Sequence, residues 1–460
     1  MAKFDVERIA EAVNGRLICG DVKKVAGVAT NSREVTRGCL FVAIIGERLD
    51  GHDFVREAFN AGAAAAIVSN PFLLLSEAGK TLILVENTVR ALQDLAAYHR
   101  RRFKKLLVVG VTGSNGKTTV KNMAAKALSA KFKTLKTEGN LNNHIGVPLT
   151  LLNLDRTHKA AVIEMGMNSP GEIARLTQIA APSIGVITNI GAAHIGRLGS
   201  LSAVRRAKEE IVVGMGQKGT AVLNASDPNS APIIKKKTRK TITFGARDVA
   251  DVELVDAWTE KNGRMIVVSH KGKETAIRLG LLGLKDVENA LAAFAVGLAA
   301  KVKPEKIAAA LGKVKAEKMR MEPLKLPNGV LVINDAYNAN PQSSEAALQS
   351  VAAMKKPGKF YFVFGDMLEL GAESENAHRR IGKLAAKSGV DAVFALGKMA
   401  ALAAAEAGKS GVRGVVRKTH WELAGAISGC VHAGDTVLVK GSRGMAMERA
   451  VTHLVEILGG

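Results

Sequence analysis

The densest group of residues able to do chemistry lies between residues 106 and 119. The segment reads Leu-Leu-Val-Val-Gly-Val-Thr-Gly-Ser-Asn-Gly-Lys-Thr-Thr, which is an apolar run, a glycine-rich turn and then a lysine and two threonines. Backbone N–H groups of such a turn bind phosphate oxygens, and a helix that begins there adds the positive end of its dipole. Lys117 would reach the β- and γ-phosphates of ATP, and the hydroxyl of Thr118 would bind Mg²⁺. The predicted nucleotide-binding residues are Thr112, Gly113, Ser114, Asn115, Gly116, Lys117, Thr118 and Thr119.

The order of elements around this turn supports the phosphate-loop interpretation. Val111 stands where the general pattern has its first glycine. The apolar strand, the Gly-Lys-Thr-Thr sequence and the following helical pattern nevertheless occur in the required order, because apolar residues recur at helical spacing from Val120 to Leu128. A chance glycine-rich turn would not be expected to combine all three.

Three further residues could hold a metal or take part in catalysis, although each has a plainer interpretation. Glu164 ends an apolar run, and a carboxylate at the carboxyl end of a parallel strand can bind Mg²⁺ or cap a helix. His194 follows the next apolar run by a short loop, and a lone histidine is more often structural than a ligand. Lys208 lies in a helical pattern, where an ordinary exposed lysine is the plain interpretation.

These residues must be positioned by alternating strands and helices. Short apolar runs alternate with helical patterns from residue 106 onward, which predicts parallel strands joined by crossover helices. The first series of predicted strands is 106–111, 160–165, 184–190 and 220–224. The second series is 331–335, 360–365, 392–397 and 436–440, and all but its last member precede an alanine-rich helical stretch. The two series predict two separate α/β sheets.

The fold class that follows is α/β with three domains. Residues 1–104 form a small mixed α/β domain in this prediction, with apolar segments at 40–45 and 63–68. The basic stretch 99–105 is a predicted linker to a central phosphate-loop domain at 105–318. A C-terminal Rossmann-like domain at 319–460 begins where the helical pattern stops before Pro323 and Pro327.

Composition limits the class of protein. The chain of 460 residues has 47% hydrophobic and 23% charged residues, and no apolar run reaches the ~18 residues that cross a bilayer. The N-terminus has no secretory-signal layout, so the cytoplasm is the expected location. Cys19, Cys39 and Cys430 are far apart and form no metal or redox motif.

The formal net charge of +23 is the one unusual bulk property. A field of this sign attracts polyanions, so a phosphate-loop protein that binds nucleic acid stays open as an alternative. Aromatic residues make up only 4% of the chain, which leaves few stacking platforms for single strands. The basic run from Lys235 to Lys240 is interpreted as a solvated face rather than a docking site, and no nucleic-acid partner is expected.

The Thr-Gly-Ser-Asn-Gly-Lys-Thr-Thr sequence resembles the ATP loop of the Mur ligases, which build the peptide of the bacterial cell-wall precursor. Residues 139–148 (Gly-Asn-Leu-Asn-Asn-His-Ile-Gly-Val-Pro), 334–341 (Asn-Asp-Ala-Tyr-Asn-Ala-Asn-Pro) and 365–371 (Gly-Asp-Met-Leu-Glu-Leu-Gly) resemble the branch that adds D-alanyl-D-alanine. The resemblance runs from Thr30 to Arg443. It implies an N-terminal domain for the UDP part of the substrate, a central ATPase and a C-terminal Rossmann-like domain.

The resemblance also implies a catalytic set. Glu164 and His194 occupy the magnesium positions of the family, with Thr118, and Arg320 fits an arginine that meets ATP phosphates from the domain hinge. Lys208 aligns with a lysine that several members carry as a carbamate. Addition of CO₂ to its neutral amine gives an anionic end that can approach Mg²⁺, whereas an ammonium would repel the metal. The implied catalytic residues are Lys117, Glu164, His194, Lys208 and Arg320, and the implied metal ligands are Thr118, Glu164, His194 and Lys208.

Further contacts are implied for the nucleotide and the two other substrates. Asn289 stands at the adenine-contacting position, although Lys285 replaces a histidine usual nearby, and Arg320 and Asp335 complete the nucleotide set. The implied substrate-binding residues are Ser32, Arg33, Gly46, Arg48, Asp50, Asn140, Asn142, Asn143, Tyr337, Asn338, Asn340, Lys440, Ser442 and Arg443. From the residues alone, the segments around 31–33 and 46–52 are equally explained as surface turns.

The implied reaction uses ATP to join D-alanyl-D-alanine to UDP-N-acetylmuramoyl-tripeptide through an acyl phosphate, in a monomeric protein. A carboxylate is a poor acylating agent, so ATP supplies the leaving group. A sibling ligase that joins another amino acid or a glutamate tail is the closest alternative, and the 334–341 segment argues against it.

Overall fold

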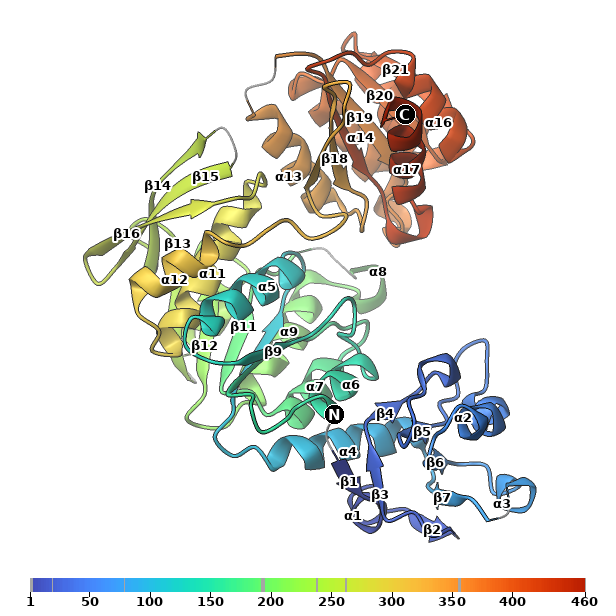
Figure 1. The fold of residues 1–460 in the computed structure, drawn as a ribbon. Helices are drawn as coiled ribbons and strands as arrows, with labels where there is room; N and C mark the ends of the chain where they lie inside the picture. The colour runs from blue at the N-terminus through green and yellow to red at the C-terminus, as the bar shows by residue number, and fades with distance from the viewer. Residues whose placement is uncertain are drawn as a thin grey trace.

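The computed structural model describes residues 3–18, 20–77, 79–191, 195–236, 239–260, 263–354 and 357–459. Its strands form a two-stranded ribbon and sheets of five, nine and six strands. In Figure 1 the central part (cyan to yellow) lies between the N-terminal part (blue) and the C-terminal part (orange to red).

The N-terminal part is a small mixed sheet with short helices. Its five strands have the order β2-β7-β6-β5-β4, parallel except for β2 against β7, and β1 pairs with β3 as a separate ribbon. The strands are β1 (Lys3–Asp5), β2 (Arg16–Ile18), β3 (Lys24–Ala26), β4 (Val28–Ala29), β5 (Leu40–Val42), β6 (Ala65–Val68) and β7 (Thr81–Leu84). The helices are α1 (Val6–Ala12), α2 (Val55–Asn60), α3 (Leu73–Ser76) and α4 (Thr88–Arg101), with short 3-10 turns η1 (Ser32–Glu34) and η2 (Gly51–Phe54).

Helix α4 joins this part to the central part through a common core. Leu92 and Leu95 on α4 belong to one buried cluster with Phe4 of β1 and with Leu151 of the central part. The prediction of a linker at 99–105 is therefore wrong for its first three residues, which form the end of α4. Arg100 is buried, and its guanidinium donates to the carbonyl oxygens of Ala180 and Ala181 at 2.9 and 3.2 Å.

The central sheet has the order β16-β15-β14-β13-β12-β11-β8-β10-β9, and its only antiparallel pairs are β14–β15 and β15–β16. One face packs on α5, α11 and α12, and the other packs on α4, α6, α7 and α9. The strands are β8 (Leu107–Thr112), β9 (Thr134–Lys136), β10 (Ala160–Glu164), β11 (Ile184–Ile187), β12 (Thr220–Asn224), β13 (Lys240–Ala246), β14 (Val252–Glu260), β15 (Gly263–His270) and β16 (Lys273–Leu279). The helices are α5 (Lys117–Ser129), α6 (Gly146–Leu152), α7 (Glu172–Ala180), α8 (Ile195–Leu198), α9 (Leu201–Val213), α10 (Ala231–Lys235), α11 (Lys285–Ala299) and α12 (Pro304–Leu311).

The C-terminal part is a second doubly wound sheet with its own two cores. Its order is β17-β18-β22-β19-β20-β21, with only β17 antiparallel. The strands are β17 (Glu322–Lys325), β18 (Leu331–Asp335), β19 (Phe360–Gly365), β20 (Ala392–Leu396), β21 (Arg413–Arg417) and β22 (Thr436–Lys440). The helices are α13 (Pro341–Ala352), α14 (Ser374–Lys387), α15 (Lys398–Gly408), α16 (His420–Ser428) and α17 (Glu448–Gly459), with the 3-10 turns η3 (Gly371–Glu373) and η4 (Arg443–Met445).

The predicted α/β class is confirmed, and each of the eight strands predicted from residue 106 onward has a counterpart. The central sheet is longer than predicted, because the prediction missed β9 and β13 and the β14–β16 extension, whose antiparallel connections carry no crossover helices. The three sheets fall within the predicted ranges 1–104, 105–318 and 319–460, and the boundaries themselves stay a prediction. No helix among the described residues is long and apolar enough to cross a membrane.

A buried histidine fixes the loop at 365–371. His378 Nε2 accepts a hydrogen bond from the backbone N–H of Met367 at 2.8 Å, and its Nδ1 lies 2.6 Å from the Ser374 carbonyl oxygen. Burial lowers the pKa of His378 from its ordinary value of 6.5. A lowered pKa in the folded state means that folding favours the neutral imidazole ring. The neutral ring therefore stabilises the fold above pH 6.5, and this stabilisation is lost as the pH falls below 6.5 toward the lowered pKa.

We therefore expect the melting temperature to fall between pH 7 and pH 5, more steeply in the wild type than in His378→Gln, since the variant has no group to protonate at this position. Thermal scans at matched ionic strength measure both slopes. Equal slopes would show that His378 does not contribute.

Candidate active site

The predicted phosphate loop lies between β8 and α5, where close packing requires glycine at two positions. Gly113 and Gly116 have φ of +152° and +79°. A Cβ on Gly113 would lie 1.8 Å from Thr188 Oγ1, and one on Gly116 would lie 2.4 Å from Asn289 Oδ1. Neither glycine can be replaced without moving the loop or its neighbour. The same contact places Asn289, at the start of α11, beside the loop.

Residues that follow β11 anchor the loop. The N–H groups of Ser114 and Asn115 donate to the carbonyl oxygen and to the Oδ1 of Asn189, both at 2.9 Å, and Thr188 Oγ1 donates to the Asn115 carbonyl oxygen at 2.6 Å. The sequence interpretation missed Thr188 and Asn189 because it extended the strand to residue 190, whereas β11 ends at Ile187. The sequence did contain a signal for them, because polar residues directly after an apolar strand are typical of a binding site at the edge of a parallel sheet.

Lys117 points back into the loop that it follows. Its Nζ donates to the carbonyl oxygens of Gly113 and Ser114 at 2.9 and 3.3 Å. Burial lowers the pKa of Lys117, Glu164 opposes this effect, and Arg320 adds to it. The ammonium thus lies in the electrostatic field of Glu164 and Arg320, although these residues come from different parts of the chain.

Glu164 ends β10 beside β8 and is buried, with 2% of its surface exposed. Its Oε1 accepts hydrogen bonds from Asn142 Nδ2 at 2.9 Å and from Thr118 Oγ1 at 3.3 Å. Its backbone N–H donates to Thr137 Oγ1 at 3.0 Å. The other carboxylate oxygen, Oε2, is buried and accepts no hydrogen bond from the described part of the chain. A buried carboxylate whose Oε1 lies against a threonine hydroxyl fits a hard cation such as Mg²⁺.

Lys208 lies on α9 and is 1% exposed. Burial shifts its pKa well below the ordinary value of 10.5, and Lys117 adds to the shift. Such a lysine is held toward its neutral form, which is the form that reacts with CO₂. As an ammonium it would not be a metal ligand. His194 lies outside the described residues, so its predicted metal role is not tested, and no group of three or more His, Cys, Asp or Glu side chains in the described ranges could hold a metal.

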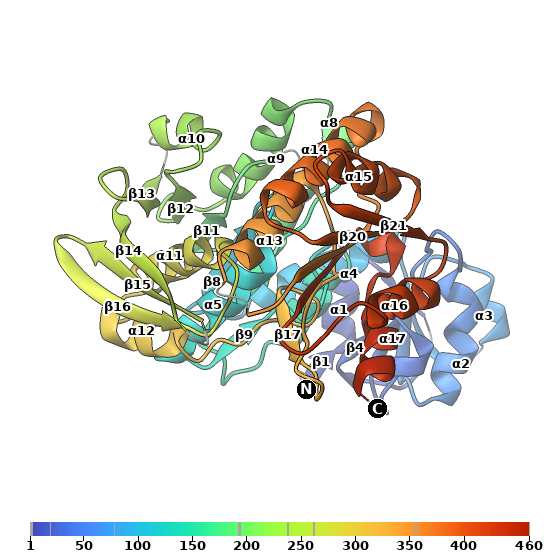
Figure 2. The ribbon, with the colours of Figure 1, turned by 90° about the horizontal axis from the view of Figure 1, so that it is seen from above.

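The C-terminal part meets the phosphate loop at Asn115. Asn340 Nδ2 donates to Asn115 Oδ1 at 2.9 Å, and Asn115 Nδ2 donates to Gln342 Oε1 at 3.3 Å. Asn340 also caps α13 and accepts from the Ser343 N–H at 2.9 Å. Seen from above, α13 lies over the start of α5 (Figure 2). Gln342 was missed by the sequence interpretation, which stopped at Pro341.

Arg320 lies on the connection between the central and C-terminal sheets. Its guanidinium stacks on the ring of Tyr337, with Cζ 4.0 Å from the ring centroid. The Tyr337 N–H donates to the Met319 carbonyl oxygen at 3.1 Å. Met319 and Met321 both have φ in the left-handed region, at +59° and +47°. The turn around Arg320 is therefore held by the loop after β18.

We expect Tyr337→Leu to lower kcat/KM for ATP by about 2- to 30-fold, because a cation–π contact contributes roughly 0.5–2 kcal/mol. Steady-state kinetics at varied ATP measures the change. Tyr337→Phe keeps the ring and serves as the control, and an equal loss in both variants would assign the effect to the hydroxyl instead.

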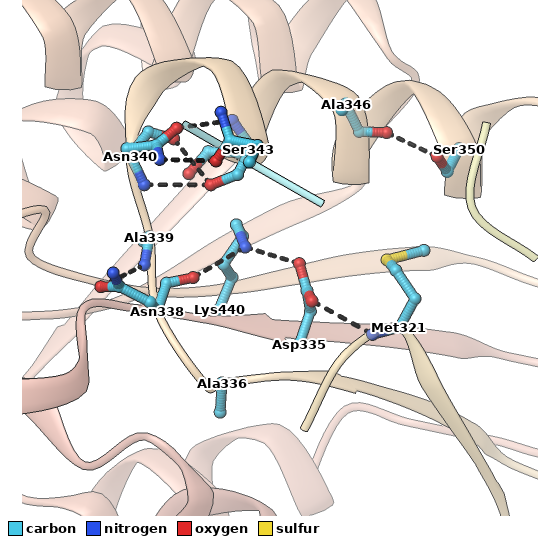
Figure 3. A network of polar contacts seen from close by, with 12 residues as sticks. Met321, Asp335, Ala336, Asn338, Ala339, Asn340, Ser343, Ala346, Ser350 and Lys440 are labelled. Atoms are coloured by element: carbon cyan, nitrogen blue, oxygen red, sulfur yellow. Dashed lines mark hydrogen bonds and ion pairs between the residues drawn. The ribbon is translucent and has the colours of Figure 1, made fainter. Parts of the chain in front are cut away.

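Asp335 and Lys440 are paired with each other (Figure 3). Lys440 is 2% exposed, and its Nζ lies 2.5 Å from Asp335 Oδ2 and 2.9 Å from the Asn338 carbonyl oxygen. Asp335 Oδ1 accepts from the Met321 N–H at 3.1 Å. Both side chains thus hold the loop after β18 in place. The predicted roles of Asp335 in nucleotide binding and of Lys440 in substrate binding stay predictions.

Ser442 and Arg443 extend this network. Ser442 Oγ donates to the Ala339 carbonyl oxygen at 3.2 Å and accepts from the Leu368 N–H at 2.8 Å. Arg443 is exposed, and its backbone N–H donates to Asn338 Oδ1 at 3.3 Å. Ser442 therefore has a structural role, whereas the exposed Arg443 guanidinium forms an ion pair with Glu448, at 3.0 Å between Nη1 and Oε1.

The remaining predicted substrate residues lie in turns. Asn143 Oδ1 accepts a hydrogen bond at 2.8 Å from the N–H of Gly146, the first residue of α6, and Asn140 is exposed. Asp50 Oδ1 accepts from the His52 N–H at 2.9 Å, a contact that lowers the pKa of Asp50. Ser32 is buried, whereas Arg33, Gly46 and Arg48 are exposed.

Among the described residues, no hydrogen bond or ion pair joins the phosphate loop to Ser32, Arg33, Gly46, Arg48 or Asp50. The structure therefore does not bring this predicted UDP segment to the catalytic group.

Comparisons with known proteins assign the three parts. Three family descriptions match the chain: "Mur ligase family, catalytic domain" at residues 24–100, "Mur ligase middle domain" at 111–297 and "Mur ligase, glutamate ligase domain" at 319–443. The chain belongs to the Mur ligase family. The UDP-N-acetylmuramoyl-tripeptide--D-alanyl-D-alanine ligases of Bacillus subtilis and Escherichia coli are 38% and 37% identical to this Mur ligase, over 99% of each chain.

Solved structures confirm the fold of this Mur ligase. MurF from Acinetobacter baumannii superposes with a TM-score of 0.90 at 32% identity, over 99% of both chains. MurF ligase from Thermotoga maritima, solved in complex with ADP, gives a TM-score of 0.84 at 29% identity, covering 94% of this chain and 98% of that one. The fold is thus the three-domain Mur ligase fold.

Proposed function

We propose that this chain is an ATP-dependent ligase that joins D-alanyl-D-alanine to UDP-N-acetylmuramoyl-tripeptide. The products are UDP-N-acetylmuramoyl-pentapeptide, ADP and phosphate. Relatives named for this activity match it over nearly the full chain. We further propose that it acts as a monomer in the cytoplasm, with domains at 1–104, 105–318 and 319–460.

The observation that carries this proposal is the contact between the phosphate loop and the C-terminal part. Asn115 of the loop binds Asn340 and Gln342, which lie in and beside the segment that resembles the Mur ligase branch that adds D-alanyl-D-alanine. Nucleotide and dipeptide would therefore meet at one place, as a ligation requires.

In the first step, a carboxylate oxygen of the tripeptide attacks the γ-phosphorus, and the bond from that phosphorus to the β–γ bridging oxygen breaks. ADP leaves and an acyl phosphate forms. Lys117 and Arg320 would offset the negative charge that spreads over the transferred group. Both cations are already held at the site, Lys117 by loop carbonyls and Arg320 by the Tyr337 ring.

Thr118 and Glu164 would hold Mg²⁺, together with Lys208 as its carbamate and with His194. When bound, the metal would neutralise phosphate charge as a Lewis acid. The carbamate forms when the Lys208 amine bonds to the carbon of CO₂ and releases one proton. Burial of Lys208, together with the positive charge of Lys117, favours the neutral amine that this reaction needs.

In the second step, the amine of D-alanyl-D-alanine attacks the acyl carbon, and the bond from that carbon to the phosphate oxygen breaks. The amine loses one proton, and phosphate leaves. Water would compete for the acyl phosphate, so packing of the C-terminal part over the loop serves to exclude it.

The test is phosphate release with ATP, Mg²⁺, the UDP-linked tripeptide and D-alanyl-D-alanine, with each component omitted in turn. We expect release to require all four. Release that ignores the dipeptide would reject the ligase assignment. Release that ignores the muropeptide, with DNA retention that falls steeply with salt, would support a nucleic-acid protein instead.

A further inference from the structure

A second lysine of α5 lies beside Glu164, and nothing in the proposed mechanism uses it. Lys121 follows Lys117 by one helical turn and so lies on the same side of the helix. It is 0% exposed, and its Nζ has no hydrogen-bond partner among the residues that the structure describes. The nearest ion-pair partner is Glu164 Oε2, at 3.9 Å, which is the carboxylate oxygen that also lacks a hydrogen bond.

A buried ammonium without a hydrogen bond, held only by an ion pair of 3.9 Å, is costly. Transfer of such a group out of water costs several kcal/mol unless a charge or a hydrogen bond compensates. Most buried polar atoms are hydrogen-bonded, so the absence of a hydrogen bond at both Lys121 Nζ and Glu164 Oε2 needs an explanation. Replacement of a buried ion pair by apolar groups is often neutral or stabilising. Stability alone therefore does not account for an ammonium at this position.

The two oxygens of Glu164 are held differently. Oε1 has the side chains of Thr118 and Asn142 as donors, whereas the only polar group that the described residues place against Oε2 is the Lys121 ammonium. The hydroxyl of Thr118, which would also bind the metal, is on the Oε1 side. The Lys121 ammonium, on the Oε2 side, keeps the carboxylate from rotating and leaves Oε1 directed toward Thr118.

The surroundings of Lys121 on α5 are fixed as well. Asn122 donates to the Glu317 carboxylate, and Lys136 Nζ donates to Asn122 Oδ1 at 3.1 Å. The charged groups that act on Lys121 are Glu164, Glu317, Lys136 and Glu138. Glu317 precedes the turn that carries Arg320, so the same short section of α5 touches both the predicted metal ligand and the connection to the C-terminal part.

We propose that Lys121 is a positioning residue that orients the Glu164 carboxylate and thereby sets the affinity of the site for its divalent metal. It acts through Glu164 and touches no substrate. The inference rests on the proposed metal role of Glu164. Direct repulsion between the ammonium and the metal would have the opposite effect, so the sign of the change on removing Lys121 decides between the two.

The variant is Lys121→Met, which has nearly the same length and no charge. Mn²⁺ binding to the ADP-saturated protein is measured from the EPR signal of free Mn²⁺, with ADP constant in all samples. We expect the dissociation constant of Mn²⁺ to rise about 10- to 100-fold, as for other residues that orient metal ligands. The melting temperature without metal is expected to fall, since removal of one member of a buried ion pair leaves the Glu164 carboxylate without its cation.

The matched control is Lys126→Met, an exposed lysine on the same helix, for which unchanged Mn²⁺ binding is expected. Lys121→Gln, also uncharged, replaces the methionine variant if that variant does not fold, and the same weakening is expected. Mn²⁺ binding that is unchanged or tighter in a folded Lys121 variant would overturn the proposal. If the wild-type protein fails to bind Mn²⁺ with ADP, the proposed metal site itself fails, which is a distinct result.

Discussion

Replacement of Lys117 by alanine is expected to lower ATP turnover by roughly 10²- to 10³-fold, the usual loss when one preorganised charge at a transition state is removed. The structure gives the reason. The Lys117 ammonium is held against the loop carbonyls of Gly113 and Ser114, where a γ-phosphate bound by the loop would lie within its reach. No described side chain on α5 other than Lys121 could supply a buried cation here, and Lys121 faces Glu164.

The measurement is steady-state phosphate release with all substrates saturating. Lys126→Ala, on the exposed side of α5, is the control and should keep nearly full activity. Circular dichroism and melting temperature establish that both variants are folded. Native-rate turnover by Lys117→Ala would mean that nucleotide phosphates do not dock in this loop, and the substrate assignment would then lose its basis.

The phosphate loop could be predicted from sequence because its function depends on local geometry. Strand, glycine turn, lysine and helix are consecutive, and the glycines at 113 and 116 have the positive φ that such a turn needs. Glu164 could be placed for a related reason, since the carboxyl ends of parallel strands meet at one edge of the sheet.

The parts that sequence could not give depend on contacts between distant segments. Asn142 and Thr137 hold Glu164, and Gln342 meets Asn115 across 227 positions of the chain. None of these pairs has a local spacing signal. Lys121 lies on the buried side of α5, where most residues are apolar. From sequence, a lysine at such a position would be expected to extend its ammonium to solvent, so its burial could not be predicted.

The connection between the first two domains shows a further limit. A run of basic residues before an apolar strand is typical of an exposed linker, yet His99 and Arg100 are buried at the end of α4. Arg100 reaches two carbonyl oxygens at the end of α7, which no composition argument could have indicated. The first domain is consequently joined to the second through a common core, whereas the C-terminal part has cores of its own.

The second large effect is expected at Lys208. Its side chain is buried beside the cationic Lys117, an arrangement that is unfavourable for two ammonium groups and favourable for one ammonium and one anion. A carbamate on Lys208 satisfies that requirement and adds an oxygen ligand for the metal. Lys208→Ala should therefore lose roughly 10²-fold or more of the ligase activity, as expected when a charge that stabilises the transition state is removed.

Loss of activity alone would not distinguish a carbamate from an ammonium, so recovery is the informative measurement. Formate or acetate added to Lys208→Ala places a carboxylate where the carbamate stood, and activity should rise with its concentration and saturate. Methylammonium at the same concentrations is the matched control, because it restores a cation instead. Recovery with the cation and none with the carboxylates would show that Lys208 acts as an ammonium, and full activity in the unsupplemented variant would exclude a role for either form.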